Sequence, residues 1–148
     1  MYRHILVPTD GSKLSAKAIR TATRLAKSFG AKLTGVYVTP PYVPPVYGEA
    51  VIYVPATTPR RFKEITEREA KKALAVVEVE AQTAGVTCKT ASVSSDQAWE
   101  GIIRAAQSKG CDLIVMASHG RRGLSGLLLG SETTKVLTHT KIPVLVCR

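Results

Sequence analysis

Two short segments of the chain combine residue types that can hold a phosphate. The longer one, residues 119–131, contains four glycines, whose missing Cβ lets backbone amides approach a ligand closely. It leads into a helical pattern that starts at Ser131, and the amides at a helix N-terminus attract anions. The hydroxyls of Ser131 and Thr133 could add hydrogen bonds to phosphate oxygens. On glycine spacing alone, a tight turn with a helix cap explains the segment equally well.

The shorter segment, Pro8-Thr9-Asp10-Gly11-Ser12, directly follows an apolar run. Its aspartate could accept hydrogen bonds from ribose hydroxyls, or it could serve only as a turn carboxylate. Neither segment carries the Walker A sequence or the dinucleotide fingerprint. A Ser-His-Asp hydrolase built on Asp10 and His119 is not favoured, because the chain lacks a Gly-x-Ser-x-Gly elbow and Gly123-Leu124-Ser125-Gly126 is one residue short.

The elements that would position these segments alternate between strand and helix. Short apolar runs predict strands at 4–7, 32–38, 86–93, 112–118 and 142–147. Helices are expected between them, begun by Ser12, by Thr58, by Ser95 or Asp96, and by Ser131. Residues 39–58 are rich in proline and predict a long loop. This alternation predicts one doubly wound, Rossmann-like α/β domain over residues 1–148, with a five-stranded parallel sheet and helices on both faces.

Composition and residue spacing narrow the classes of partner and site. The formal net charge of +10 raises nucleic acid as a partner, but the basic residues are distributed along the chain, so nucleic acid is only a minor alternative. No apolar run reaches the roughly 20 residues of a membrane-spanning helix. The three cysteines form no CxxC pair and favour a reduced, cytoplasmic protein. The histidines lack metal-ligand spacing, so a divalent ion such as Mg²⁺ would be carried by the phosphates of a ligand.

Three stretches together resemble the universal stress protein family, and its ATP-binding branch in particular. They are Ile5-Leu6-Val7-Pro8-Thr9-Asp10-Gly11-Ser12, then Ser118-His119-Gly120 followed after nine residues by Gly130-Ser131, and finally Ile142-Pro143-Val144-Leu145-Val146. The resemblance implies an adenine nucleotide alpha hydrolase-like fold and a bound ATP, AMP or ADP. The nucleotide contacts that it implies are Pro8, Thr9, Asp10, Val38, Met116, Ala117, Gly120, Gly130, Ser131, Glu132 and Thr133. Ala117 departs from the family pattern, which usually has glycine there.

The resemblance also implies a homodimer that forms through Val144, Leu145 and Val146. The function it predicts is regulatory and stress-responsive, with at most slow ATP hydrolysis and with a regulated protein as a further partner. Two alternatives remain open: a ligand-free interaction module of the same family, and a nucleotide hydrolase that uses Asp10 or His119 to orient water.

Overall fold

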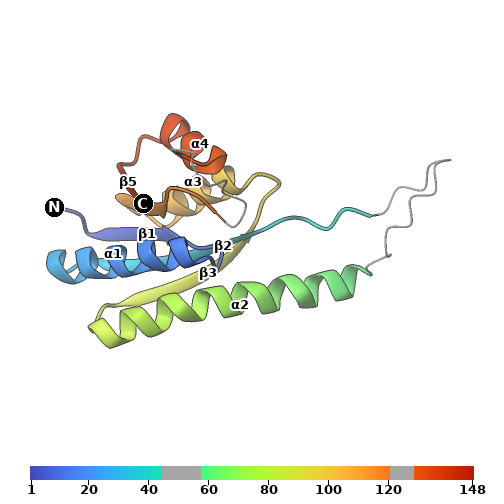
Figure 1. Ribbon diagram of the computed structural model, residues 1–148, viewed down its shortest axis with the longest axis horizontal. Helices are drawn as coiled ribbons and strands as arrows, with labels where there is room; N and C mark the ends of the chain where they lie inside the picture. Colours follow the sequence, from blue (N-terminus) through green and yellow to red (C-terminus); the bar gives the residue numbers. More distant parts are fainter. Residues whose placement is uncertain (45–57, 121–128) are drawn as a thin grey trace.

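The computed structural model describes residues 1–44, 58–120 and 129–148, in which strands and helices alternate (Figure 1). The order is β1 (His4–Pro8), α1 (Lys13–Phe29), β2 (Lys32–Thr39), α2 (Pro59–Ala84), β3 (Cys88–Ser94), α3 (Ala98–Ser108), β4 (Leu113–Ala117), α4 (Ser131–His139) and β5 (Val144–Cys147). The sequence therefore predicts the order and type of these elements, with ends that differ by one or two residues.

The five strands form one parallel sheet in the order β3-β2-β1-β4-β5. Helices α1 and α2 contact each other on one face, and α3 contacts α4 on the opposite face (Figure 1). The predicted α/β fold class is thus confirmed. The chain leaves β1 toward one edge and β4 toward the other, so the winding direction reverses between these two strands. In such sheets the crevice at the carboxyl ends of the two diverging strands is the usual ligand site.

The two central strands are buried on both faces, which explains their uninterrupted apolar sequences. Ile5 and Val7 of β1 pack into a core cluster with α1 and α2, whereas Leu6, between them, packs with α3 and α4. Along β4, Val115 and Met116 divide between the same two clusters. The core thus consists of two layers, separated by the sheet.

Local caps begin and end the two longest helices as predicted. The Ser12 side chain accepts a hydrogen bond from Ser15 N–H at 3.1 Å, and α1 ends at Gly30, whose φ of 63° lies in the left-handed region. Thr58 caps α2 by accepting from Arg61 N–H at 3.2 Å, ahead of the first-turn proline. These signals are local in sequence, which is why they are readable without a structure.

The predicted caps of α3 and α4 are wrong. The residue before α3 is Gln97, not Ser95 or Asp96, and its side chain makes no capping hydrogen bond. The cap of α4 is Gly130, so Ser131 is the first helical residue. Gly130 takes this position because its N–H donates to Ser118 O at 2.7 Å and holds it in an extended conformation, with φ −72° and ψ 158°.

The predicted loop at 39–58 begins one residue later than expected, since Thr39 still belongs to β2. Its residues 45–57 lie outside the described part of the chain. At its start, the Tyr42 ring meets the Phe62 ring edge-on at 5.5 Å. Helix α2 extends past the end of the sheet (Figure 1), and its buried residues begin only at Ala70. No helix among the described residues is both long enough and apolar enough to cross a membrane.

Candidate functional site

The two predicted phosphate-binding segments meet at the carboxyl ends of β1 and β4. An ideal Cβ placed on Gly120 would lie only 2.8 Å from Oδ2 of Asp10. A side chain at position 120 would therefore require the Asp10 carboxylate to move, and glycine lets this carboxylate lie against the second loop. The other carboxylate oxygen, Oδ1, accepts a hydrogen bond from Ser12 N–H at 2.9 Å. Asp10 is thus a turn carboxylate that also faces the second loop.

The residues before Asp10 hold the backbone of the first loop. Pro8 is the last residue of β1 and pairs with Val36 of β2. Thr9 is buried: its N–H donates to Val36 O at 2.9 Å, and its Oγ1 accepts from Gly11 N–H at 3.1 Å. The Thr9 hydroxyl also lies 3.1 Å from the hydroxyl of Ser15 in α1. The loop therefore has a defined shape before any ligand arrives.

The second loop ends at the N-terminus of α4, close to the end of β4. An ideal Cβ on Gly130 would lie 3.1 Å from Ser118 O and 3.4 Å from His119 Cα, so the chain passes here at glycine distance. The first intrahelical hydrogen bond of α4 runs from Thr134 N–H to Gly130 O at 3.0 Å. The amides of Ser131, Glu132 and Thr133 precede that bond, and such amides attract anions.

The hydroxyl of Thr133 has a different partner from the predicted one. Thr133 is 2% exposed, and its Oγ1 donates to Ala117 O at 3.0 Å and to Ser118 O at 3.2 Å. These bonds fasten the first turn of α4 to the end of β4. The predicted hydrogen bond from this hydroxyl to a phosphate stays a prediction, whereas in this structure the hydroxyl donates to the end of β4.

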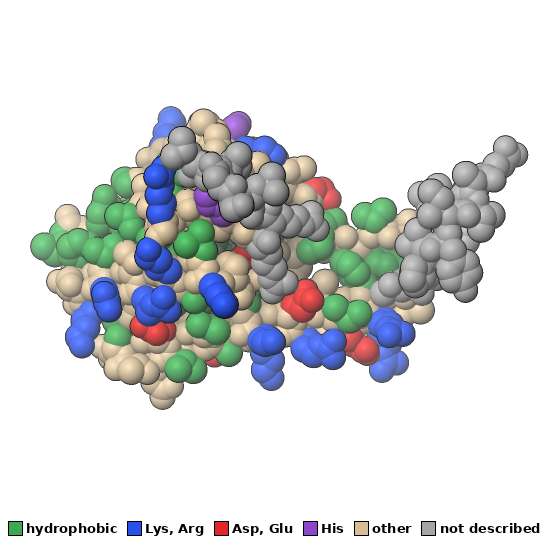
Figure 2. Space-filling view, viewed as in Figure 1, with side chains coloured by type: hydrophobic (Ala, Val, Ile, Leu, Met, Phe, Trp, Pro, Cys, Tyr) green, Lys and Arg blue, Asp and Glu red, His purple; other side chains and the backbone are tan. Residues whose placement is uncertain are grey.

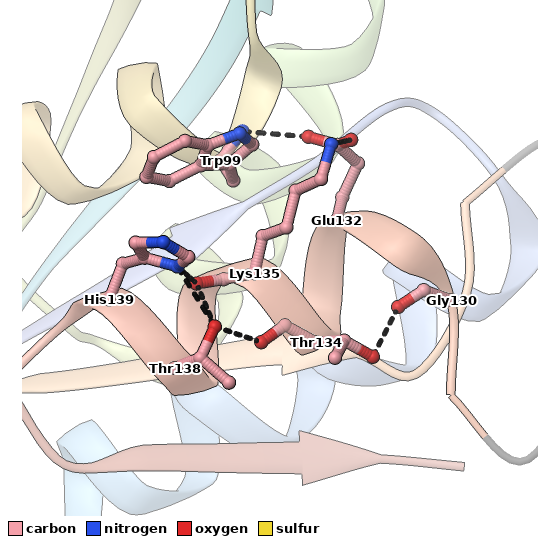
Figure 3. A network of polar contacts seen from close by, with 7 residues as sticks. All are labelled: Trp99, Gly130, Glu132, Thr134, Lys135, Thr138 and His139. Atoms are coloured by element: carbon pink, nitrogen blue, oxygen red, sulfur yellow. Dashed lines mark hydrogen bonds and ion pairs between the residues drawn. The ribbon is translucent and has the colours of Figure 1, made fainter.

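The carboxylate of Glu132 also has a structural role (Figure 3). Its Oε2 accepts a hydrogen bond from the backbone N–H of Trp99 at 2.8 Å, and Oε1 lies 3.8 Å from Lys135 Nζ. Helix α3 has no capping bond from its own N-cap side chain, so Glu132 supplies an acceptor from α4. A carboxylate pointing at bound phosphates would repel them, and Glu132 is instead engaged by α3 and by Lys135.

Sequence reasoning missed this contact because its partners lie 33 residues apart. The ring of Trp99 packs on His139, with centroids 4.5 Å apart and planes tilted by 39° (Figure 3). Trp99 is partly buried against the core cluster of α3 and α4, so it packs against the core.

The apolar residues predicted to surround the nucleotide divide between the two layers. Met116 and Val38 belong to the layer of α3 and α4, and an ideal Cβ on Gly101 of α3 would lie 2.8 Å from Val38 Cγ1. Ala117 is 9% exposed and lies in the opposite layer, where it joins the core with α1. The Ala117 side chain is therefore accommodated by core packing, and Met116 and Ala117 present their side chains to opposite layers.

Ser118 and His119 form a close pair at the end of β4. The Ser118 hydroxyl lies 2.9 Å from His119 Nδ1, and Ser118 is only 2% exposed. Among the described residues, the buried Nε2 of His119 has no hydrogen-bond partner. The same part of the chain contains no group of three His, Cys, Asp or Glu side chains that could hold a metal ion. Residues 121–128, including Gly123-Leu124-Ser125-Gly126, lie outside the described residues.

Resolved pKa shifts concern groups at the start of β1, at the start of the edge strand β3 and just before β4, not the candidate site. Burial would raise the pKa of Asp112, but N–H groups of His4 and Arg3, at 2.9 and 2.8 Å, outweigh it and lower this pKa. Burial lowers the pKa of His4 and raises that of Cys88. Burial also raises the pKa of Cys111 to about 11. These four groups report packing of the sheet, so they do not mark a catalytic centre.

The predicted dimer segment lies at an edge of the sheet. Strand β5 is the last strand in the sheet order, and its only described strand partner is β4. Leu145 is 39% exposed, whereas Val144 and Val146 are partly buried. One side of β5 is therefore without a strand partner in the described part of the chain, and the homodimer implied by the resemblance stays a prediction.

Comparisons with known proteins agree with this architecture. The family model described as "Universal stress protein family" matches residues 1–148. A universal stress protein of Methanocaldococcus jannaschii is 35% identical over 149 residues, covering 100% of this chain and 83% of that protein. The structure of universal stress protein UspA from Lactobacillus plantarum has a TM-score of 0.77 and 27% identity, covering 99% of this chain and 98% of that one. A universal stress protein solved in complex with cAMP has a TM-score of 0.70 and 25% identity, covering 99% and 96%.

Proposed function

Because the chain belongs to the universal stress protein family, we propose that it binds an adenine nucleotide, ATP in the first place, at the carboxyl ends of β1 and β4. The observation that carries the proposal is the contact between the two loops at this crevice, where Asp10 faces Gly120 and α4 begins alongside. A similar protein has been solved with cAMP, which supports an adenine nucleotide as the class of ligand.

In this proposal, the amides of Ser131, Glu132 and Thr133 hold the phosphates, and the exposed hydroxyl of Ser131 adds a donor. Asp10 accepts hydrogen bonds from the ribose. Val38 and Met116 contribute apolar surface toward the adenine. Thr133 and Glu132 act through their side chains on the position of α4, not on the ligand. An accompanying Mg²⁺ would be held mainly by the phosphates.

The substitution Ser131→Pro tests the amide cradle directly. Proline lacks the N–H but is favoured at the first helical position, and Gly130 before it already has the extended conformation that precedes proline. The variant should fold normally and lose one charge-assisted hydrogen bond, worth about 1.5–3 kcal/mol, which lowers ATP affinity about 10- to 100-fold. Isothermal titration calorimetry with ATP and with adenosine measures the effect.

The matched control is Ser131→Ala, which removes the hydroxyl and keeps the amide. It should lose only a few fold in ATP affinity, and adenosine should bind both variants as it binds the unmodified protein. If Ser131→Pro binds ATP unchanged, the phosphates do not lie at α4. If the unmodified protein binds no adenine nucleotide, the proposal fails and the ligand-free alternative stands.

The proposed role is regulatory: the protein acts by binding the nucleotide rather than by hydrolysing it. Fast phosphoryl transfer needs a positioned base and a cationic clamp on the phosphates. The buried Ser118 hydroxyl is not accessible as a nucleophile. Hydrolysis of ATP, measured in a single-turnover assay on the same preparation, is expected to be slow, and a fast rate would favour the hydrolase alternative.

A homodimer that pairs the two β5 edges completes the proposal. Pairing would satisfy the outer backbone groups of β5 and cover Leu145. Light scattering on Leu145→Lys should show a monomer, whereas Leu137→Lys, at a similarly exposed residue on α4, should stay dimeric. A monomeric unmodified protein, or equal effects of the two variants, would contradict this interface.

A further inference from the structure

Helix α1 carries a continuous row of cationic side chains on its outer face. The row repeats at intervals of four, three, four and three residues, so its members share one side of the helix. All five are exposed: Lys13, Lys17, Arg20, Arg24 and Lys27. At 1.5 Å per residue, the row extends over about 21 Å.

None of the ion pairs between described residues involves this basic row. The sequence of α1 contains no Asp or Glu, so the helix contributes five of the net ten positive charges of the protein. The ion pairs that the described residues form involve Arg60, Lys63 and Lys135, all outside α1. Helix α2 is different, because its six Lys and Arg stand against five Glu, a net charge of +1.

Helix α1 therefore aligns on one face five cations that lie within 15 residues of sequence. Figure 2 shows Lys and Arg side chains along the half of the molecule formed by α1 and α2. Like charges three and four residues apart repel one another and destabilise a helix. A polyanion bound along α1 would relieve this repulsion and release its own counterions.

We propose that the outer face of α1 binds the phosphate backbone of a nucleic-acid duplex, without sequence preference. A duplex presents a dense line of phosphates, about one charge per 1.7 Å of axis, which matches a linear row of cations. Single strands are usually held by base stacking on aromatic side chains. The one aromatic residue of α1, Phe29, packs instead against the core and Tyr2.

An anionic bilayer fits this face less well. Peripheral helices bind membranes by inserting apolar side chains below the headgroups. The exposed large hydrophobic side chains in the described part of the chain are Met1, Val43, Val76, Val79, Leu137 and Leu145, and none belongs to α1. The apolar side of α1 is buried against the sheet. The outer face of α1 therefore offers positive charge but no apolar side chains to insert into a bilayer, and this suits a phosphate backbone better.

The test variant is Arg20→Gln/Arg24→Gln/Lys27→Gln. It leaves Lys13, which adjoins the proposed nucleotide site, and Lys17, whose Nζ donates to the Arg148 carbonyl. The matched control, Arg61→Gln/Arg68→Gln/Lys72→Gln, removes the same charge from exposed positions of α2. Both variants have a net charge of +7 against +10 for the unmodified protein. Circular dichroism melting confirms their folding, and Arg24→Gln alone serves if the triple variant does not fold.

The probe is a fluorescein-labelled 20-base-pair DNA duplex, in two unrelated sequences, titrated by anisotropy at salt concentrations from 50 to 200 mM. The unmodified protein should bind both alike, with a Kd of roughly 10⁻⁴–10⁻⁶ M at the upper salt concentration. The α1 variant should lose about tenfold or more at 50 mM salt. The slope of log K against log salt should fall by about 2.7, which is 0.9 for each of three phosphate contacts, or by about 0.9 for Arg24→Gln.

The α2 control should change affinity less than twofold, and ATP affinity should be the same in all three proteins. Equal losses in the two variants would overturn the proposal, because net charge alone would explain them. Absence of duplex binding would overturn it too, as would α1-dependent binding to phosphatidylserine vesicles in place of DNA. Because ATP binding is measured separately, failure here is distinguishable from failure of the nucleotide site.

Discussion

Replacing Thr133 by valine separates two roles that its hydroxyl could have, fastening α4 to β4 or binding a ligand. Valine has nearly the same shape as threonine and the same branching at Cβ, so helix propensity and packing change little. The substitution removes only the hydroxyl that donates to Ala117 O and Ser118 O. It thus tests one polar contact inside the core.

The expected loss of stability depends on which hydrogen bonds the two carbonyls retain in Thr133→Val. Ser118 O retains a hydrogen bond from Gly130 N–H at 2.7 Å, whereas Ala117 O loses the hydroxyl as its donor. A buried polar group deprived of its partner costs about 1–3 kcal/mol. For a chain of this size, each kcal/mol lowers Tm by about 2–4 °C, so the expected decrease is about 2–12 °C.

Urea unfolding followed by circular dichroism gives the free energy, and thermal melting gives Tm. The control is Thr134→Val, one residue further along the same helix. The Thr134 hydroxyl donates to Gly130 O at 3.0 Å, but its side chain is exposed, so water replaces the lost bond and the change stays within about 0.5 kcal/mol. Thr133→Ser, which keeps a hydroxyl, should recover part of the stability.

The reasoning is refuted if Thr133→Val unfolds with the same free energy as the unmodified protein yet binds ATP more weakly. That combination would mean that the hydroxyl faces the phosphates in solution. A loss of stability equal to that of Thr134→Val would likewise show that the bonds to the β4 carbonyls contribute nothing.

Three further predictions concern side chains that do not hold the phosphates in this proposal. Glu132→Ala leaves the N–H of Trp99 without its acceptor, which should cost about 1 kcal/mol of stability, as for a lost helix cap, and shift the fluorescence of the only tryptophan of the chain. Glu132→Gln keeps an acceptor and should restore the emission. An unshifted Glu132→Ala spectrum would argue against the contact. Asp112 has a lowered pKa in the folded state, so its contribution to stability is present above its unfolded pKa, near 3.9, and is lost as pH falls through the folded value. The difference in free energy of unfolding between the protein and Asp112→Asn, measured in urea, should be steady from pH 5 to 8 and disappear below about pH 4. A difference that is independent of pH would contradict this. Iodoacetamide at pH 8, followed by peptide mass spectrometry, should label half-buried Cys88 before buried Cys111, whose pKa is about 11, and the reverse order would contradict the burial of Cys111.

The elements that sequence predicts well are those specified by neighbouring residues. Ser12 and Thr58 cap helices through bonds to amides three residues ahead, and Gly30 ends a helix by its own conformation. The starts of α3 and α4 depend instead on distant partners. Gly130 is held by Ser118 across the glycine loop, and Glu132 accepts a hydrogen bond from Trp99, 33 residues earlier in the chain. No local pattern carries that information.

The candidate site shows the same division. The meeting of Asp10 with Gly120 follows from the strand order, which the alternation of strands and helices makes predictable. The inward position of Thr133 has a signal in the sequence, because it lies three residues before buried Val136 on one helix face. The opposite orientations of Met116 and its neighbour also follow from strand periodicity. The roles of these side chains were nevertheless not separable without their contacts.

The position of β1 at the centre of the sheet has a consequence for synthesis of the chain. Gly120 follows Asp10 by 110 positions, so at about 5–20 residues per second the ribosome needs roughly 5–20 s between the two halves of the site. During that interval β1 can pair with β2, but its other neighbour, β4, has yet to emerge. A nucleotide can therefore stabilise the domain only after both halves of the site have been synthesised. Until then, the nascent chain must keep Leu6 away from water without help from the ligand.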